Sequence, residues 1–162
     1  KQNYHFHGVF AIDFSLKDNK GVCVFNHLCN IDIKALLKKK IKYIGFVTNL
    51  DKHDESGSHW IAMYIDLYKN EIYFFDSYGE EPPKEVNTLA NRLVEQGKKI
   101  GRNMKYKINE TRHQYKNSEC GVYCINFIIS LLEGNSFEEI TQNKVKDDVI
   151  NLKRDYFFTP TL

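Results

Sequence analysis

Residues 112–124 read Arg-His-Gln-Tyr-Lys-Asn-Ser-Glu-Cys-Gly-Val-Tyr-Cys, and the apolar run Ile-Asn-Phe-Ile-Ile-Ser-Leu-Leu follows at 125–132. A polar loop that ends in Cys-Gly and continues into apolar sequence predicts a buried helix with Cys120 at its N-terminus. The first N–H groups of a helix lack internal partners and carry the positive end of its dipole, so a thiol there is biased toward thiolate. Cys120 is therefore a candidate nucleophile; the alternative is an ordinary buried cysteine.

The composition indicates one domain spanning residues 1–162. Of the 162 residues, 42% are apolar and 27% charged, and the 14% aromatic content favours strands in a well-packed interior. No apolar run approaches the roughly eighteen residues that would span a bilayer, and no charged-then-apolar leader opens the chain. We therefore expect a soluble protein that makes no contact with membranes and is not secreted.

The cysteines and the net charge exclude several kinds of site. Cysteines at 23, 29, 120 and 124 form neither Cys-x-x-Cys pairs nor a disulfide scaffold, which favours a reducing compartment. The cysteines and histidines show no zinc-like spacing, so we expect no metal. A net charge of +2 is too small to indicate nucleic-acid binding by itself. Two basic clusters, at 34–42 and 98–107, are most simply solvated surfaces.

The hydrophobic pattern predicts strands mainly in the first half and helices in the second, which is typical of an α+β fold. The strands are expected at 8–14, 22–25, 43–48, 59–66, 72–76 and 104–108, the last at an edge of the sheet. The helices are expected at 33–40, 82–96, 120–132 and 145–158, with one more short helix that begins at a capping box at Ser136. Asp32 is the expected N-cap of the first and Gly97 the expected C-cap of the second. The last has an apolar face at 145, 149, 152 and 156.

A cysteine becomes an acyl-transfer nucleophile when a histidine takes its proton and an acid or amide orients that histidine. Of the six histidines, His59 is favoured as the base because it opens a predicted strand directly after a loop that contains Gly57. Residues at the end of a rigid strand can reach solvent and substrate. The alternative is a histidine that is merely hydrogen bonded at a strand end.

Asp76 ends the partner strand of the predicted hairpin. In a hairpin with an even-numbered loop, an odd separation puts two residues on one face, and 76 − 59 = 17 is odd. A turn centred on 69–70 places Asp76 opposite Met63, whereas a turn centred on 67–68 places it opposite His59, so the register stays open. Asp76 is alternatively no more than the first residue of an Asp-Ser-Tyr-Gly turn.

Gln114 lies six residues before Cys120, at the far end of the same loop. Its side-chain amide could donate to an oxyanion together with the backbone N–H of Cys120. Gly121 leaves room for a substrate to approach the helix mouth closely. Taken alone, however, Gln114 is more simply an ordinary polar loop residue.

The ordered set of His59-Trp60, Asp76 and Gln114-x5-Cys120-Gly121 resembles the cysteine peptidase superfamily that includes adenain and the proteases of SUMO and other ubiquitin-like proteins. The resemblance covers roughly residues 43–132. Residues 112–121 and 77–83 look like those of polyprotein-processing proteases of African swine fever virus, other large DNA viruses and virophages. The African swine fever virus enzyme has an asparagine where this chain has Asp76, and the acid is the more common residue in such triads.

The resemblance implies an adenain-like fold, with a mixed, mainly antiparallel central sheet flanked by helices and the catalytic cysteine at the start of a buried helix. It also implies a thiol endopeptidase in which Cys120 attacks, His59 acts as base and then acid, and Asp76 orients the imidazole. Gln114 would line the oxyanion hole. Trp60 would wall a narrow cleft over the scissile bond, which favours cleavage at Gly-Gly or Gly-x sites, and both Trp60 and Gly121 would contact the substrate.

The resemblance favours a viral maturation protease that cuts capsid or core precursors in the infected cell and is packaged in the virion. A monomer is the expected oligomeric state. No cofactor is required, although adenain is stimulated by DNA and by a peptide. The clusters Lys38–Lys42 and Lys98–Lys107 could bind DNA weakly in the same way. The alternatives are a SUMO or ubiquitin-like deconjugating protease, an acetyltransferase with the same catalytic set, and a catalytically dead binding module.

Overall fold

A five-stranded sheet forms the centre of the computed structural model, which describes residues 3–158. Its strands lie side by side in sequence order. They are β1 (Tyr4–Ala11), β2 (Tyr43–Asn49), β3 (Trp60–Asp66), β4 (Glu71–Phe75) and β5 (Lys105–Ile108). The pairs β2–β3 and β3–β4 are antiparallel, whereas the edge strands β1 and β5 pair in parallel with their neighbours. The expected mixed sheet is therefore confirmed, with its antiparallel part in the centre.

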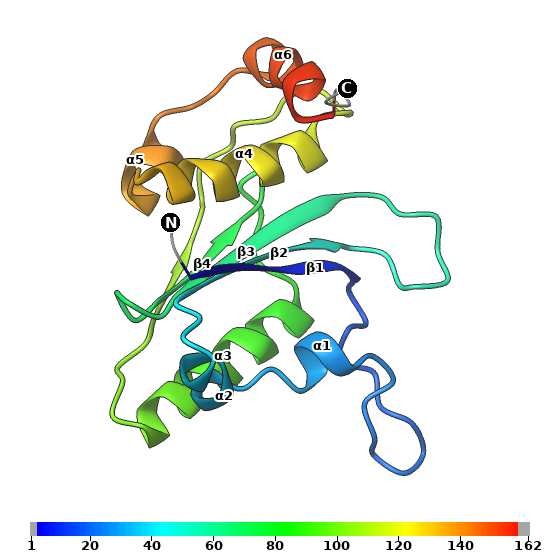
Figure 1. Cartoon of the computed structure of the whole chain (residues 1–162). Helices are drawn as coiled ribbons and strands as arrows, with labels where there is room; N and C mark the ends of the chain where they lie inside the picture. The colour runs from blue at the N-terminus through cyan, green and yellow to red at the C-terminus, as the bar shows by residue number, and fades with distance from the viewer. Residues whose placement is uncertain (1–2, 159–162) are drawn as a thin grey trace.

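Helices cover both faces of this sheet (Figure 1). One face carries α1 (Asn26–Cys29), α2 (Ile33–Lys38) and α3 (Lys84–Lys99). The other carries α4 (Cys120–Glu133), α5 (Phe137–Gln142) and α6 (Asp147–Phe158), with α6 lying over α4. Within residues 3–158, no helix combines the length and the apolar character needed to cross a membrane.

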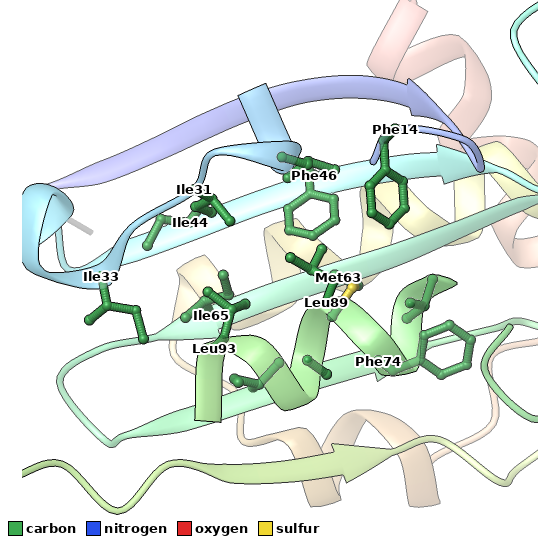
Figure 2. Packing of buried hydrophobic residues seen from close by; sticks show 14 of the residues in the cluster. Phe14, Ile31, Ile33, Ile44, Phe46, Met63, Ile65, Phe74, Leu89 and Leu93 are labelled. Atoms are coloured by element: carbon green, nitrogen blue, oxygen red, sulfur yellow. The ribbon is translucent and has the colours of Figure 1, made fainter. Parts of the chain in front are cut away.

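The central strands are apolar along their whole length because both of their faces are buried. Alternate residues of β3 point to opposite sides, so Met63 packs toward α3 while Tyr64 packs toward α4. Figure 2 shows the first of these two cores, in which Phe46 and Phe74 of the sheet meet Leu89 of α3. The second core joins α4 to the sheet and thereby places the N-terminus of α4 at one end of β3.

Two caps expected from the sequence form, and a glycine ends the helix that begins at Cys120. The side chain of Asp32 caps α2 by accepting a hydrogen bond from the Ala35 N–H at 2.7 Å. Ser136 and Glu139 form the reciprocal capping box that opens α5. Gly134 ends α4 with a φ of 109°, a left-handed conformation that glycine adopts without steric cost. These three ends are set locally, because each depends on residues only a few positions apart.

Three expectations for the N-terminal third are wrong. The first strand is Tyr4–Ala11 and not 8–14, because parallel pairing with β2 sets its extent. Residues 22–25, which lie within the described part of the chain, form no strand, and Cys23 makes only an isolated bridge to Lys17. Cys23 and Cys29 are joined by a disulfide, whereas the cysteine spacing favoured reduced thiols.

Gly97 does not cap α3. It is buried inside that helix, where a Cβ would lie 2.4 Å from the Met104 Cγ. The helix continues to Lys99, and Gly101, with a φ of 73°, takes the left-handed conformation after it. Close packing against the segment before β5 is therefore the reason for glycine at 97.

The apolar face of the last helix also differs from the prediction. Leu152 and Tyr156 are 77% and 83% exposed, while Ile150 is fully buried and Asp147, the first residue of α6, is only 8% exposed. The helix is rotated relative to the expected stripe, so that it presents an acidic side chain to the loop before α4. The contacts of that side chain are described below.

Candidate active site

Cys120 is the first residue of α4, as the sequence predicts. Its side chain is half-buried, and the backbone N–H groups of Trp60 and Gly121 lie at hydrogen-bonding distance from its sulfur. The three residues come together because α4 packs across β3, which begins at Trp60. Cys120 therefore faces the end of the β3–β4 hairpin.

His59 lies between Cys120 and Asp76. The His59 Nε2 atom is 2.7 Å from the Asp76 Oδ1 atom, and the two side chains are only 12% and 4% exposed. His59 is also hydrogen bonded to the Cys120 side chain, which leaves its Nδ1 atom as the nitrogen that faces the sulfur. The order thiol, imidazole, carboxylate is the arrangement that converts a cysteine into a nucleophile.

The register of the hairpin lies between the two considered from the sequence. Ala62 pairs with Phe75 and Asp66 with Glu71, so the turn is centred on 68–69. Continuing this pairing places Asp76 opposite Ile61, two residues from His59. The two functional side chains are thus diagonal neighbours on one face, at a separation that long side chains can bridge.

Asp76 contacts His59 and also starts a turn. Its Oδ1 atom also accepts the Tyr78 N–H at 2.8 Å. Its backbone oxygen accepts hydrogen bonds from the Gly79 N–H at 3.0 Å and from the Asn109 Nδ2 atom at 2.7 Å. Asn109 is fully buried and carried no signal in the sequence. The carboxylate therefore has a fixed direction before any substrate arrives.

The site favours an ion pair between Cys120 and His59. Burial by itself would lower the pKa of His59, but hydrogen bonds to Asp76 and Cys120 outweigh it and raise the pKa to about 9. Burial would raise the pKa of the Cys120 thiol, yet the hydrogen bond from His59 and those from the Trp60 and Gly121 backbone lower it below its ordinary value. A thiolate next to an imidazolium is the reactive form of a cysteine nucleophile.

Gln114 is a fully buried residue rather than a solvated loop side chain. Its Oε1 atom accepts the Ser77 hydroxyl at 2.6 Å, and its Nε2 atom donates to the Lys116 carbonyl at 2.5 Å. The Tyr78 hydroxyl is farther from Nε2, at 3.4 Å. Within residues 3–158, the hydrogen-bond partners of the Gln114 side chain do not include Cys120, His59 or Asp76. The amide is thus held in the loop before α4, and one of its N–H groups has only a weak partner.

Tyr78 is a site residue that the sequence pattern did not indicate. Its ring stacks on the His59 ring with centroids 4.7 Å apart and planes 19° apart, and the Arg112 guanidinium lies 5.3 Å from the Tyr78 centroid. The adjacent Gly79 has a φ of 72°, and a Cβ there would lie 2.8 Å from the Arg112 N atom. Only glycine lets the turn after Asp76 approach the loop before α4 this closely.

A cavity of about 530 Å³ opens beside Cys120 between β1, α4 and the end of α6. A Cβ on Gly121 would project toward the Trp60 ring, at 3.7 Å from its Cδ1 atom, and would narrow this space. Apolar side chains dominate the walls, with Arg154 and Ser118 at the edge. The lining side chains and glycine are Phe6, Val9, Val47, Trp60, Ser118, Gly121, Val122, Ile125, Arg154 and Phe158.

The other thiols lack such an environment. Cys124, one turn after Cys120, is fully buried, and burial raises its pKa well above the ordinary value. Cys23 and Cys29 are bonded to each other. Among the described residues, no group of three or more His, Cys, Asp or Glu side chains is arranged to hold a metal ion.

The chain is similar to known proteases. Residues 14–159 match the C-terminal catalytic domain of the Ulp1 protease family. The chain is 36% identical over 157 residues to the candidate thiol protease R355 of Acanthamoeba polyphaga mimivirus, covering 96% of this chain and 50% of R355. It is 28% identical over 125 residues to the SUMO-1 cysteine protease S273R of African swine fever virus, isolate Pig/Kenya/KEN-50/1950, covering 75% and 46%.

The fold is also found in a solved structure. The crystal structure of the African swine fever virus pS273R protease matches with a TM-score of 0.79 at 22% identity, covering 96% of this chain and 60% of that chain. The chain spans about half the length of the curated relatives that it matches. The chain belongs to the Ulp1 protease family and is a cysteine-type protease domain.

Proposed function

We propose that this domain is an endopeptidase that uses Cys120, His59 and Asp76 as a catalytic triad. The observation that carries the proposal is the continuous hydrogen-bonded order of these side chains at the start of α4, with the His59 Nε2 atom 2.7 Å from Asp76. The lowered pKa of Cys120 supports the same role. Gln114 is the proposed side-chain donor of the oxyanion hole.

In the first half of the reaction, the Cys120 thiolate attacks the scissile carbonyl carbon and an S–C bond forms. The carbonyl electron pair moves to oxygen, where the Gln114 amide and the Cys120 backbone N–H donate hydrogen bonds. The C–N bond then breaks, and the His59 Nδ1–H gives its proton to the leaving amine. Asp76 holds the imidazolium in place through Nε2 during this transfer.

In the second half, His59 acts as the base. Its neutral Nδ1 atom takes a proton from water as the water oxygen attacks the thioester carbon. The C–S bond breaks, the thiolate returns, and the new carboxylic acid leaves. The imidazolium that results restores the ion pair with Cys120, which is the state favoured by the pKa shifts of both groups.

The proposed substrates are proteins with glycine beside the scissile bond, at Gly-Gly or Gly-x sites. Trp60 and Gly121 stand beside Cys120 and line the adjacent cavity, so the peptide must pass between an indole and a helix end. A substrate glycine has no side chain to collide with these walls. The apolar part of the cavity offers space for larger side chains farther along the peptide.

The proposed biological role is maturation of a virus particle by cleavage of capsid or core precursors. This rests on relatives from mimivirus and African swine fever virus that are described as thiol or cysteine proteases. The enzyme would act in the infected cell as a monomer and be packaged in the virion. Stimulation by DNA or by a peptide belongs to the same proposal, with the basic clusters at 34–42 and 98–107 as the surfaces for DNA.

A second candidate is removal of SUMO or a related modifier from target proteins. It is favoured by the family match and by the relative that is named a SUMO-1 cysteine protease. A deconjugating enzyme needs a surface for a folded modifier as well as the cleft for its extended tail. Cleavage of a SUMO precursor therefore discriminates it from a protease that needs only a short Gly-Gly segment.

The test compares wild type with Cys120→Ala on virion precursors, on Gly-Gly peptides and on a SUMO precursor, with sequencing of the new termini. We expect Gly-containing cleavage sites in the precursors and peptides with wild type alone. Efficient cleavage of the SUMO precursor at low enzyme would favour the second candidate. Equal cleavage by both proteins would reject the Cys120 mechanism. Mass spectrometry after brief iodoacetamide treatment should show Cys120 carrying the label before Cys124 does.

A further inference from the structure

Asp147 is a buried acid at the start of α6 that the proposed mechanism leaves unused. Its Oδ2 atom accepts the backbone N–H groups of Tyr115 at 2.9 Å and Lys116 at 3.1 Å. Its Oδ1 atom lies 3.1 Å from the hydroxyl of Tyr123, a residue of the helix that begins at Cys120. The side chain thus joins three segments: α6, α4 and the loop between β5 and α4.

The two amides that Asp147 binds immediately follow Gln114. The next carbonyl along the chain, that of Lys116, accepts the Gln114 Nε2 atom at 2.5 Å. Asp147 therefore fixes the backbone that in turn sets the direction of the Gln114 amide. On the opposite side, the Ser77 backbone oxygen accepts the N–H groups of His113 and Gln114, at 2.8 Å each. The backbone around Gln114 is thus held on two sides, by the Ser77 carbonyl on one and by the Asp147 carboxylate on the other.

The Asp147 carboxylate is buried, so its hydrogen bonds must offset the cost of removing it from water. A carboxylate that is only 8% exposed must be compensated by hydrogen bonds, because its desolvation is otherwise costly. The backbone donors of 115 and 116 provide that compensation, and hydrogen bonds to an ionised acceptor are stronger than neutral ones. Removing the carboxylate would in turn leave these loop amides without their partner. The conformation of the loop therefore depends on the Asp147 side chain.

The same helix contacts the other end of this loop. The Arg154 guanidinium, two turns along α6, donates to the Ser118 carbonyl at 2.7 Å and to the Glu119 carboxylate at 2.9 Å. Ser118 and Glu119 directly precede Cys120. Helix α6 thus holds the segment from Tyr115 to Glu119 at both ends. This explains why α6 buries Asp147 and leaves the apolar Leu152 and Tyr156 exposed.

We propose that Asp147 is a positioning residue for the oxyanion hole, acting through the backbone of 115–116 on Gln114. The inference rests on the proposed function of Gln114 as an oxyanion donor. Asp147 touches neither the substrate nor the reacting atoms. Its loss is expected to impair stabilisation of the tetrahedral intermediate while the Cys120–His59 pair stays intact.

A purely structural role is the competing explanation, because an acid in the first turn of a helix is favourable for that helix in any protein. The two roles predict different kinetics. A structural defect lowers the amount of folded enzyme and affects every reaction of Cys120 equally. A positioning defect affects only reactions that develop an oxyanion. Alkylation by iodoacetamide displaces iodide at an sp³ carbon and forms no such intermediate, so it reports on the nucleophile alone.

The experiment measures kcat and KM for a Gly-Gly peptide and the iodoacetamide rate of Cys120 in Asp147→Ala, Asp147→Asn and Asp148→Asn. We expect Asp147→Ala to lower kcat about 10- to 100-fold with KM nearly unchanged and the alkylation rate and its pH profile unchanged. Asp147→Asn keeps an oxygen that can accept the two backbone N–H groups but loses the negative charge that strengthens these bonds, so its kcat should lie between those of Asp147→Ala and wild type. Asp148→Asn is the matched control, because Asp148 bonds the Lys116 side chain at the solvent-exposed surface and should behave as wild type.

Wild-type kcat in both Asp147 variants would overturn the inference, and so would a parallel loss of kcat and alkylation. If Asp147→Ala does not fold, Asp147→Asn tests the inference instead. We expect its kcat to lie below that of wild type and its alkylation rate to be normal. A wild-type kcat in that folded variant would then reject the role. Failure of the triad itself has a different signature, since peptide cleavage would then survive in Cys120→Ala whatever residue stands at 147.

Discussion

The His59 Nε2 atom lies 2.7 Å from the Asp76 Oδ1 atom, although the hairpin register places Asp76 opposite Ile61. The contact is diagonal and spans the open end of the hairpin, beyond the last paired residues of β3 and β4. There the imidazole can also reach Cys120 on α4.

Replacing Asp76 should damage catalysis more than folding. Asp76→Ala removes the acceptor of the His59 Nε2–H, and we expect kcat/KM for a Gly-Gly peptide to fall about 100-fold or more. Asp76→Asn keeps an oxygen for this bond and should retain more activity than Asp76→Ala. Asp54→Asn, an exposed change in the loop before His59, is the control. Similar activity in wild type and folded Asp76→Ala would contradict the triad.

The two pKa shifts predict a broad plateau of activity with an alkaline limb near pH 9. Below the lowered pKa of Cys120 the thiolate is lost, and above about 9 the His59 imidazolium loses the proton that the leaving amine needs. The His59 imidazolium also stabilises the folded state. Its contribution to the free energy of unfolding is complete below the unfolded pKa of about 6.5 and disappears as pH rises through about 9. A pH series of kcat/KM and thermal denaturation midpoints tests both statements. Asp76→Ala should move the alkaline limb to lower pH, and an unmoved limb would assign it to another group.

Gln114→Ala should lower kcat about 10- to 1,000-fold with little change in KM, because the lost donor acts on the oxyanion rather than on the bound peptide. The iodoacetamide rate of Cys120 should stay at the wild-type value. Ser77→Ala removes the hydroxyl that orients the Gln114 Oε1 atom at 2.6 Å and should give a smaller loss in the same parameter. A change confined to KM in Gln114→Ala would place that residue in peptide binding instead.

Two glycines near the site should respond in opposite ways to alanine. At Gly121 the added Cβ meets only the Trp60 ring at 3.7 Å, so Gly121→Ala should fold normally and raise KM by narrowing the cavity. At Gly79, with a φ of 72°, the Cβ would collide with the Arg112 N atom at 2.8 Å, so Gly79→Ala should lower the unfolding free energy by more than about 1 kcal/mol. Peptide kinetics and denaturant titrations of both variants make the comparison. An unchanged KM in Gly121→Ala would indicate that peptides bind elsewhere.

Signals of short range in the sequence were sufficient for most elements of the fold. The apolar run after Cys120, the caps at Asp32 and Ser136 and the apolar segments that form β3 and β4 each depend on neighbouring residues. Features that depend on contacts between distant parts of the chain could not be predicted from neighbouring residues. The extent of β1 depends on its partner β2, and the glycine at 97 is required by the approach of Met104 to α3. The bond between Cys23 and Cys29 likewise depends on how the chain folds back around α1.

For the site, the odd separation of His59 and Asp76 determined that they share a face, because side chains alternate along a strand with a period of two. The pattern around Cys120 determined that a thiol begins a buried helix, because helical periodicity is local. The register, the stacking of Tyr78 on His59 and the hydrogen bonds of Asp147 to 115–116 were decided only by tertiary structure. Each joins segments that are distant in sequence, and such contacts form only once the sheet and α4 have packed.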